Sequence, residues 1–170
     1  MLLDDVDKDR AGAYRMLADL FSRPPAGEEL EGLKEDLELE SKDTQDEIRD
    51  DFSSLFALPD GKLPPVESFF TGIPNDDAAG SASAYYADAG LVIDDEYTAV
   101  PDHLSLEFLF MSYLIDSKKT DFQINFVEAH IINWVPDYCD EVVRQAGTSF
   151  YREIAEITQN FISNEYENLE

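Results

Sequence analysis

The feature of this sequence that most constrains its fold is an apolar segment between Pro101 and Ile115. After Asp102 and His103, nearly every residue of this segment is apolar, which is the pattern of a helix buried on most of its sides. His103 and Glu107 stand four residues apart, so they share one helical face and we expect that they can hydrogen-bond. The segment therefore predicts a buried central helix with an acid and a histidine at its entry.

The remaining chain shows helical rather than strand periodicity. Apolar side chains recur at helical spacing within residues 6–22, 28–40, 44–58, 120–146 and 150–161. Strand signals are scarce. The sequence therefore predicts an all-α fold, a single-domain helical bundle of about seven to eight helices with a hinge before the Pro101-Asp102-His103 helix.

Several residues predict where these helices begin and end. Thr44 and Glu47 form a candidate capping box, and Thr120 or Asp121 is expected to cap the helix that follows. Pro136 cannot donate a backbone hydrogen bond, so we expect it to interrupt one helix and to begin another.

Turn residues divide the chain into two helical halves within one domain spanning 1–170. We expect an N-terminal half over 1–90, which ends at Gly90, and a C-terminal half over 102–170. Residues 91–101 between them are expected to form a linker or hinge.

The charge of the chain limits its partners. Lys and Arg number 12 against 38 Asp and Glu, so the net charge is −26, and nucleic acid or an anionic membrane surface is excluded as a partner. The acidity either steers cationic partners or reflects adaptation to a salty cytoplasm. No basic and apolar leader opens the sequence and no long apolar run occurs, so we expect a soluble cytoplasmic protein without membrane insertion.

The sequence carries few groups suited to catalysis. His103 and His130 are the two histidines, and Cys139 has no cationic neighbour in sequence that would activate it. The spacing typical of metal ligands and of phosphate-binding loops is absent, so we expect neither a metal site nor covalent catalysis. On chemistry alone, Asp102 is a carboxylate in the first turn of its helix, and His103 with Glu107 is a buried polar pair.

The ordered set of motifs resembles the TorD/DmsD/NarJ family, cytoplasmic chaperones for molybdenum-cofactor oxidoreductases. The motifs are Arg10…Tyr14-Arg15-Met16-Leu17-Ala18-Asp19-Leu20-Phe21…Pro24, Leu55-Phe56, Pro64-Pro65-Val66-Glu67-Ser68, Tyr85-Tyr86…Gly90-Leu91, Pro101-Asp102-His103-Leu104…Glu107-Phe108…Phe110-Met111, His130-Ile131-Ile132-Asn133-Trp134-Val135-Pro136 and Phe150-Tyr151. The chain departs from the family at Val100, where relatives commonly carry an acid, and at Val66, where some carry an aromatic residue.

This resemblance implies a chaperone that is not an enzyme. It would bind the leader peptide, which is expected to be of the twin-arginine type, or the apo form of a molybdoenzyme catalytic subunit, and hold it for cofactor insertion. The residues implied in leader binding are Tyr14, Leu55, Phe56, Pro65, Val66, Pro101, Asp102 and His103. Those implied in structure are Glu107, His130, Trp134 and Pro136.

The resemblance also implies features that the residues themselves do not show. Relatives are associated with weak guanine-nucleotide binding, and the chain could be a monomer or a domain-swapped dimer; no other cofactor is expected. Two alternatives stay open: a weak nucleotide hydrolase that uses Asp102, His103 and Glu107 as acid–base groups, and a generic acidic helical interaction domain.

Overall fold

The computed structural model describes residues 2–72, 77–92 and 100–169, with side chains from residue 6 onward. Its elements are α1 (Leu2–Ser22), α2 (Gly27–Asp36), α3 (Gln45–Leu55), α4 (Glu67–Thr71), α5 (Ala78–Asp88), α6 (Leu104–Asp116), α7 (Thr120–Phe126), a π-helical turn (Val127–Ile131), α8 (Ile132–Gln145) and α9 (Ser149–Leu169). Across these ranges the backbone forms no strand beyond a single isolated bridge. The expected all-α bundle is confirmed, whereas most of the expected hinge falls on residues 93–99, outside the described residues.

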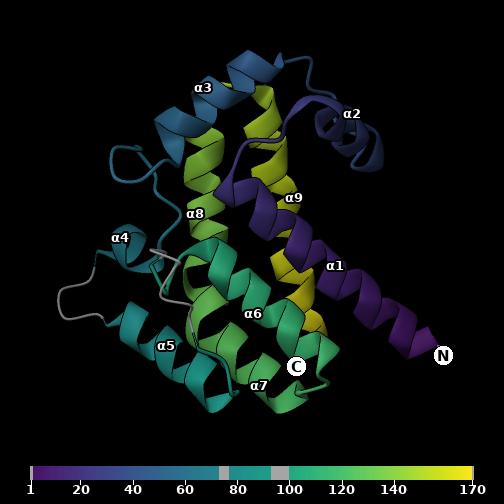
Figure 1. Cartoon of the computed structure of the whole chain (residues 1–170), viewed down its shortest axis with the longest axis vertical. Helices are drawn as coiled ribbons and strands as arrows, with labels where there is room; N and C mark the ends of the chain where they lie inside the picture. The colour runs from purple at the N-terminus through teal and green to yellow at the C-terminus, as the bar shows by residue number, and fades with distance from the viewer. Residues whose placement is uncertain (1, 73–76, 93–99, 170) are drawn as a thin grey trace.

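Helix α6 is the central element of the bundle. It packs along α1 on one side, and α8 and α9 pack against each other behind it (Figure 1). Phe108, Met111 and Leu114 are fully buried, and the exposed residues of α6 are Leu109 and the terminal Asp116. The buried helix predicted from the apolar segment is therefore present, and it begins at Leu104.

The two ends of the chain are joined by an ion pair. The guanidinium of Arg10 on α1 donates to both carboxylate oxygens of Glu165 on α9, at 2.7 and 2.9 Å. Next to it, the Tyr14 ring packs edge-on against Phe108 and Phe161. Helix α1 thus contacts both the central helix and the last helix of the chain.

Acidic side chains close the ends of helices at the top of the bundle. Thr44 and Glu47 form the predicted capping box at the start of α3. Further along α3, the Asp51 carboxylate accepts hydrogen bonds from the backbone N–H groups of Gly147 and Thr148, at 3.0 and 2.9 Å. Asp51 therefore ties α3 to the start of α9.

Two expectations about helix ends are wrong. Pro136 does not begin a helix but lies inside α8, and the π-helical turn precedes α8 without a break. Ahead of the proline, the Asn133 side chain donates to the backbone carbonyls of residues 128 and 129 in the π-helical turn, at 3.0 Å each. At the start of α7 the capping residue is Lys119, and neither Thr120 nor Asp121 acts as the cap.

Candidate functional site

Two segments that lie far apart in sequence meet at an antiparallel β-bridge between Val66 and His103. Backbone hydrogen bonds of 2.8 and 3.0 Å flank this bridge on either side. We call residues 64–67 together with residues 101–104 the bridge region. It joins the start of α4 to the start of α6, and so brings two of the predicted binding motifs together.

Asp102 caps α4 rather than its own helix. Its side chain is fully buried, and its Oδ2 accepts a hydrogen bond of 2.8 Å from the backbone N–H of Ser68. Its other oxygen, Oδ1, has no hydrogen-bond partner in the described part of the chain. The expectation that Asp102 lies in the first turn of α6 is wrong, because α6 begins at Leu104, two residues further on.

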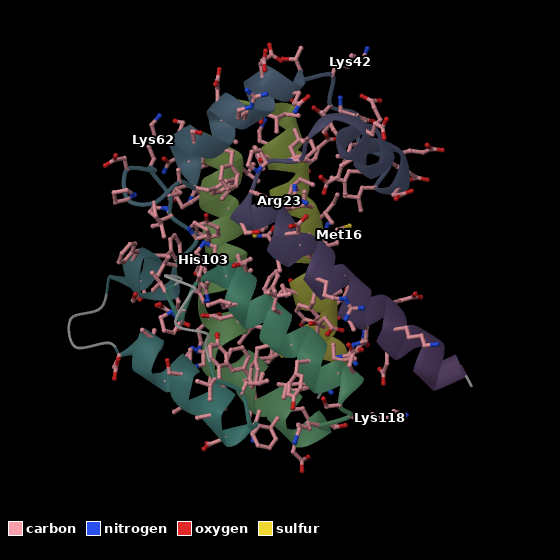
Figure 2. The ribbon with its side chains drawn as sticks, in the orientation of Figure 1. Met16, Arg23, Lys42, Lys62, His103 and Lys118 are labelled. Atoms are coloured by element: carbon pink, nitrogen blue, oxygen red, sulfur yellow. The ribbon has the colours of Figure 1, made fainter. Side chains whose placement is uncertain are left out.

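His103 is the N-cap residue of α6 and is partly exposed beside α4 (Figure 2). Its Nδ1 accepts a hydrogen bond of 3.1 Å from the backbone N–H of Ser105 and lies 2.8 Å from the Ser105 hydroxyl. Since the backbone N–H can only donate, Nδ1 is unprotonated and the ring hydrogen is on Nε2. Burial lowers the pKa of His103 to about 4, against an opposing effect of the Asp102 carboxylate, so the ring is neutral at neutral pH.

Glu107 does not pair with His103, contrary to the expectation from their spacing. The two side chains diverge because His103 caps the helix while Glu107 points into the core, where the indole N–H of Trp134 donates to its Oε1 at 3.1 Å. The Glu107 side chain is fully buried, and no described residue forms a hydrogen bond with its Oε2. Burial first, and then the neighbouring Glu67 carboxyl, raise the pKa of Glu107 well above its ordinary value.

Glu67 and His130 complete this buried cluster. His130 Nδ1 lies 2.6 Å from Glu67 Oε1, and its Nε2 lies 2.9 Å from the Ser81 hydroxyl. The three side chains of Glu67, Glu107 and His130, which we call the carboxyl cluster, come from α4, α6 and the π-helical turn. His130 thus links α4 and α5 to the C-terminal half of the bundle.

The carboxyl cluster is also the one group, among the described residues, whose potential ligand atoms lie close enough to share a metal ion, all within 4.8 Å of one another. The donor atoms do not suit that use, however. The imidazole Nδ1 and a Glu67 oxygen are already joined by a direct hydrogen bond, and a cation between them would have to break it. The cluster is built as a hydrogen-bond network.

The residues predicted to line a leader-binding groove occupy different surroundings. Pro65, Val66, Pro101, Asp102 and His103 come together in the bridge region, and of these five only Pro101 and His103 are partly exposed.

The other three predicted lining residues lie in the core. Tyr14, Leu55 and Phe56 are buried, and the Phe56 ring packs on Phe21 and on Tyr151. The bridge region is therefore the part of the predicted site that the structure assembles near the surface.

An apolar hollow lies next to the bridge region. It encloses about 270 Å³ and is lined by Ser83, Tyr86, Ala87, Leu91 and Val92. The Tyr86 hydroxyl donates a hydrogen bond of 2.7 Å to the carbonyl of Pro101, so the wall of the hollow is joined to the bridge region. Val92 is 92% exposed at its rim. This hollow can accept an apolar side chain from a partner.

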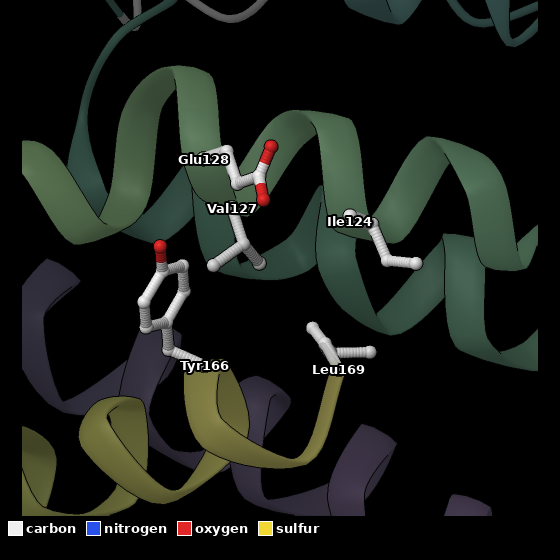
Figure 3. A pocket seen from close by; sticks show the side chains of 5 residues that line it. All are labelled: Ile124, Val127, Glu128, Tyr166 and Leu169. Carbon is white, nitrogen blue, oxygen red and sulfur yellow. The ribbon is translucent and has the colours of Figure 1, made fainter.

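Two further hollows lie elsewhere on the molecule. One is an acidic cleft between α3 and the start of α9, lined by Asp43, Glu47, Asp50, Asp51, Gly147 and Thr148. The other is a shallow apolar hollow in which Tyr166 and Leu169 of α9 face Ile124 and Val127 (Figure 3). The carboxylates of Asp43 and Asp51 already cap backbone N–H groups, and the second hollow is too shallow to hold a peptide side chain.

Three residues of the site were missed from the sequence. Glu67, Ser81 and Tyr86 contact His130, Glu107 or Pro101 only because helices that are distant in sequence come together. Glu67 was visible as part of the Pro64-Pro65-Val66-Glu67-Ser68 motif, but no spacing within the chain predicts a partner 63 residues away. No helix in the described part of the chain is long and apolar enough to span a membrane.

Comparison with known proteins places this arrangement in a family. The family model described as nitrate reductase delta subunit matches residues 22–140, and this chain belongs to that family. The matched region holds the whole bridge region and the carboxyl cluster.

The chain is similar to several curated and solved proteins. It is 25% identical over 130 residues to the chaperone protein TorD of Vibrio parahaemolyticus, covering 68% of this chain and 60% of that protein. It is 30% identical over 112 residues to TorD of Vibrio atlanticus, covering 57% and 52%. The chain thus matches little more than half the length of these relatives.

A solved structure shares the fold. It is that of a protein assigned as a redox enzyme maturation protein from Archaeoglobus fulgidus, with a TM-score of 0.60 and 20% identity. The likeness covers 91% of this chain and 93% of the other, and at this identity it concerns the fold alone.

Proposed function

We propose that this protein is a maturation chaperone that binds the leader peptide or the apo form of a molybdenum-cofactor oxidoreductase until its cofactor has been inserted. The observation that carries the proposal is the family match over residues 22–140 together with curated relatives named as TorD chaperones. The expected cytoplasmic location and the absence of catalysis belong to the same proposal.

The surface beside the bridge region supports this function. A leader of the twin-arginine type joins guanidinium groups to an apolar stretch, so its site needs an apolar hollow on an acidic molecule. The hollow beside Tyr86 is apolar, and the net charge of the chain is −26. A cationic peptide would be attracted to the whole molecule and would place an apolar side chain in the hollow.

Burial divides the predicted contact residues into two roles. Pro101 and His103 are partly exposed, so they can touch a bound peptide, and the neutral His103 ring offers its Nε2 hydrogen as a donor to a peptide carbonyl. Asp102 is fully buried and holds α4 in place, so we assign it a positioning role. Tyr14, Leu55, Phe56, Pro65 and Val66 would act from the core by fixing the helices around the groove.

Calorimetric titration with a synthetic leader tests the proposal. The leader is taken from the molybdoenzyme encoded nearest to this protein, and the control peptide replaces both arginines by glutamine. We expect binding of the native leader that weakens with added salt and is weaker for the control peptide. A full-length apoenzyme pull-down is run in parallel, and no binding of either leader or apoenzyme would exclude this function.

The two alternatives find less support. An acid–base hydrolase would need Asp102, His103 and Glu107 to reach a nucleotide, but Asp102 and Glu107 are fully buried and His103 is engaged with Ser105. Weak guanine-nucleotide binding stays a prediction from the resemblance. A generic acidic interaction domain predicts indifference to leader sequence, which the glutamine control peptide measures directly.

A further inference from the structure

Two carboxyl groups lie side by side in the core of this protein, with the His130 imidazole beside them. Glu107 is 0% exposed and Glu67 is 5% exposed, and each has an oxygen within 4.8 Å of the other and of His130. Two ionised carboxylates in such a place would repel each other and would both lack hydration.

The hydrogen bonds of Glu67 and Glu107 leave one buried carboxyl oxygen without a partner among the described residues. Glu67 Oε1 lies 2.6 Å from His130 Nδ1, where an ionised Glu67 would accept the ring hydrogen, and Glu107 Oε1 accepts from the indole of Trp134. Glu107 Oε2 is buried and has no partner among the described residues. A carboxylate oxygen can only accept, whereas a protonated carboxyl can donate, so one hydrogen on Glu107 Oε2 directed at Glu67 would satisfy the open position.

We propose that Glu67 and Glu107 hold one proton between them, and that this shared proton is a latch that fastens α4 and the bridge region to α6 and α8. We assign the proton to Glu107, because its Oε2 is the buried oxygen left without a partner among the described residues, whereas Glu67 Oε1 is already paired with the His130 ring. When the proton is lost, two buried negative charges face each other across the α4–α6 contact.

The groups that face the pair determine the direction of the pH effect. Besides His130 on the π-helical turn, they are Asp102 in the bridge region and Tyr86 on α5, whose pKa is itself raised by burial and by the nearby carboxylates. Helix α8 contributes the uncharged Trp134, and α1 approaches α6 through Tyr14, which packs on Phe108 rather than on Glu107. The charged groups that act on Glu107 are the carboxylates of Glu67 and Asp102, so this surrounding favours the neutral carboxyl, in line with the raised pKa of Glu107.

Proton linkage determines whether the folded state gains or loses stability as the pH rises. The folded state keeps the Glu107 proton above the ordinary glutamate pKa of about 4.5, whereas the unfolded chain releases it there, so raising the pH favours unfolding. One linked proton lowers the ratio of folded to unfolded protein by about tenfold per pH unit. This loss begins near pH 4.5 and continues until the folded protein also releases the proton.

The latch acts on the element that carries the proposed leader contacts. Helix α4 has five residues, and it is fastened through Glu67, through the Asp102 cap and through Phe70, whose ring packs on Trp134 and Tyr138. Loss of the proton weakens the first of these attachments. The consequence for leader binding rests on the proposed function, whereas the consequence for α4 does not.

The experiment compares the wild type with Glu107→Gln by urea unfolding between about pH 5 and pH 9. Glutamine has the shape of a protonated glutamate and carries no charge, so its amide can donate to Glu67 at every pH. We expect the folded-to-unfolded ratio of the wild type to fall with pH relative to the variant, by up to about tenfold per pH unit. Hydrogen exchange at the Ser68 amide should accelerate with pH in the wild type beyond the intrinsic rate, and should not do so in Glu107→Gln.

Glu165→Gln is the matched control, because Glu165 is also buried but is paired with Arg10. This variant should be less stable than the wild type, but its folded-to-unfolded ratio should fall with rising pH as steeply as that of the wild type. If the folded-to-unfolded ratios of the wild type and Glu107→Gln changed with pH in parallel, the proposed latch would be wrong. The same conclusion would follow from a stoichiometric divalent cation in the purified protein whose removal by EDTA destabilises the wild type and not Glu107→Gln, because the cluster would then be a metal site.

Leader titration over the same pH range separates the two proposals. If the leader binds, its affinity should fall at alkaline pH for the wild type and stay constant for Glu107→Gln, and an equal fall in both proteins would exclude control of binding by the latch. If no leader binds at any pH, the proposed function fails, and the unfolding and exchange results still decide whether the proton latch exists.

Discussion

Among the single residues, Asp102 shows that burial can give a motif residue a structural role in place of the predicted contact with a partner. Its place in Pro101-Asp102-His103 suggested a carboxylate offered to a guanidinium, yet its side chain is fully buried and accepts the Ser68 N–H. A carboxylate at the N-terminus of a short helix stabilises that helix through the cap hydrogen bond and the helix dipole. The structural effect of this residue can therefore be measured separately from any effect on a partner.

We expect Asp102→Ala to lower the free energy of unfolding by about 1 kcal/mol, which is the typical cost of losing an N-terminal cap. Asp102→Asn keeps an oxygen that can accept the Ser68 N–H, so it should lose less. Urea unfolding at neutral pH measures both. Equal losses would contradict the capping role, and a loss of leader affinity in Asp102→Asn without loss of stability would indicate a direct charge contact.

The sequence predicts which residues of the site matter better than it predicts how they pair. Glu107, His130 and Trp134 were expected to be structural, and they all lie in the buried network. The expected pair of His103 with Glu107 does not form, because helical spacing places two residues on one face without deciding which way each side chain turns. The true partners, Glu67 and Trp134, come from other helices.

At the scale of helices, a buried carboxylate connects α3 to the start of α9 through hydrogen bonds. Asp51 on α3 accepts hydrogen bonds from two backbone N–H groups and from the Thr148 hydroxyl, which stand before α9. Its neighbour Asp50 points to the solvent. This pair of adjacent acids allows a controlled comparison.

Asp51→Ala should destabilise the protein by about 1–3 kcal/mol, since it leaves buried N–H groups without an acceptor. Asp50→Ala should change the free energy of unfolding by less than about 0.5 kcal/mol, as surface substitutions usually do. Thermal and urea unfolding of the two variants provide the measurement. The role of Asp51 as a link between α3 and α9 would be refuted by equal effects of the two substitutions.

Helices with clear apolar spacing and explicit caps were predictable, as the Thr44–Glu47 capping box shows. The continuity of the helical segment through Pro136 was not. A proline signal is local, whereas the π-helical turn and the Asn133 side chain that accommodate this stretch depend on the packed backbone. The bridge between Val66 and His103 was hidden for a similar reason, since one pair of residues has no periodicity to detect.

For the whole molecule, the dominant property is its charge. With 38 acidic and 12 basic side chains, most carboxylates have no basic partner, so the folded state repels itself. The surface ion pairs, such as Arg23 with Asp19 and Glu29, are exposed and contribute little.

We expect the urea midpoint to rise when sodium chloride is increased from about 0.1 M to about 1 M, because the screening length falls from about 10 Å to about 3 Å. A non-ionic osmolyte at equal osmolality is the control for excluded-solute effects. A midpoint that stays constant or falls in salt would show that charge repulsion is not a major cost of folding here.

The contact of α1 with α6 has a consequence for how the chain folds as it is made. Arg15 pairs with Asp116 and Arg10 pairs with Glu165, across 101 and 155 residues of sequence. During synthesis the first helix therefore leaves the ribosome long before the helices that cover it exist, and its apolar face has to wait in contact with water or with other proteins. A protein that we propose to shelter the unfinished form of another must itself pass through an unfinished form, in which α1 has been synthesised and α9 has not.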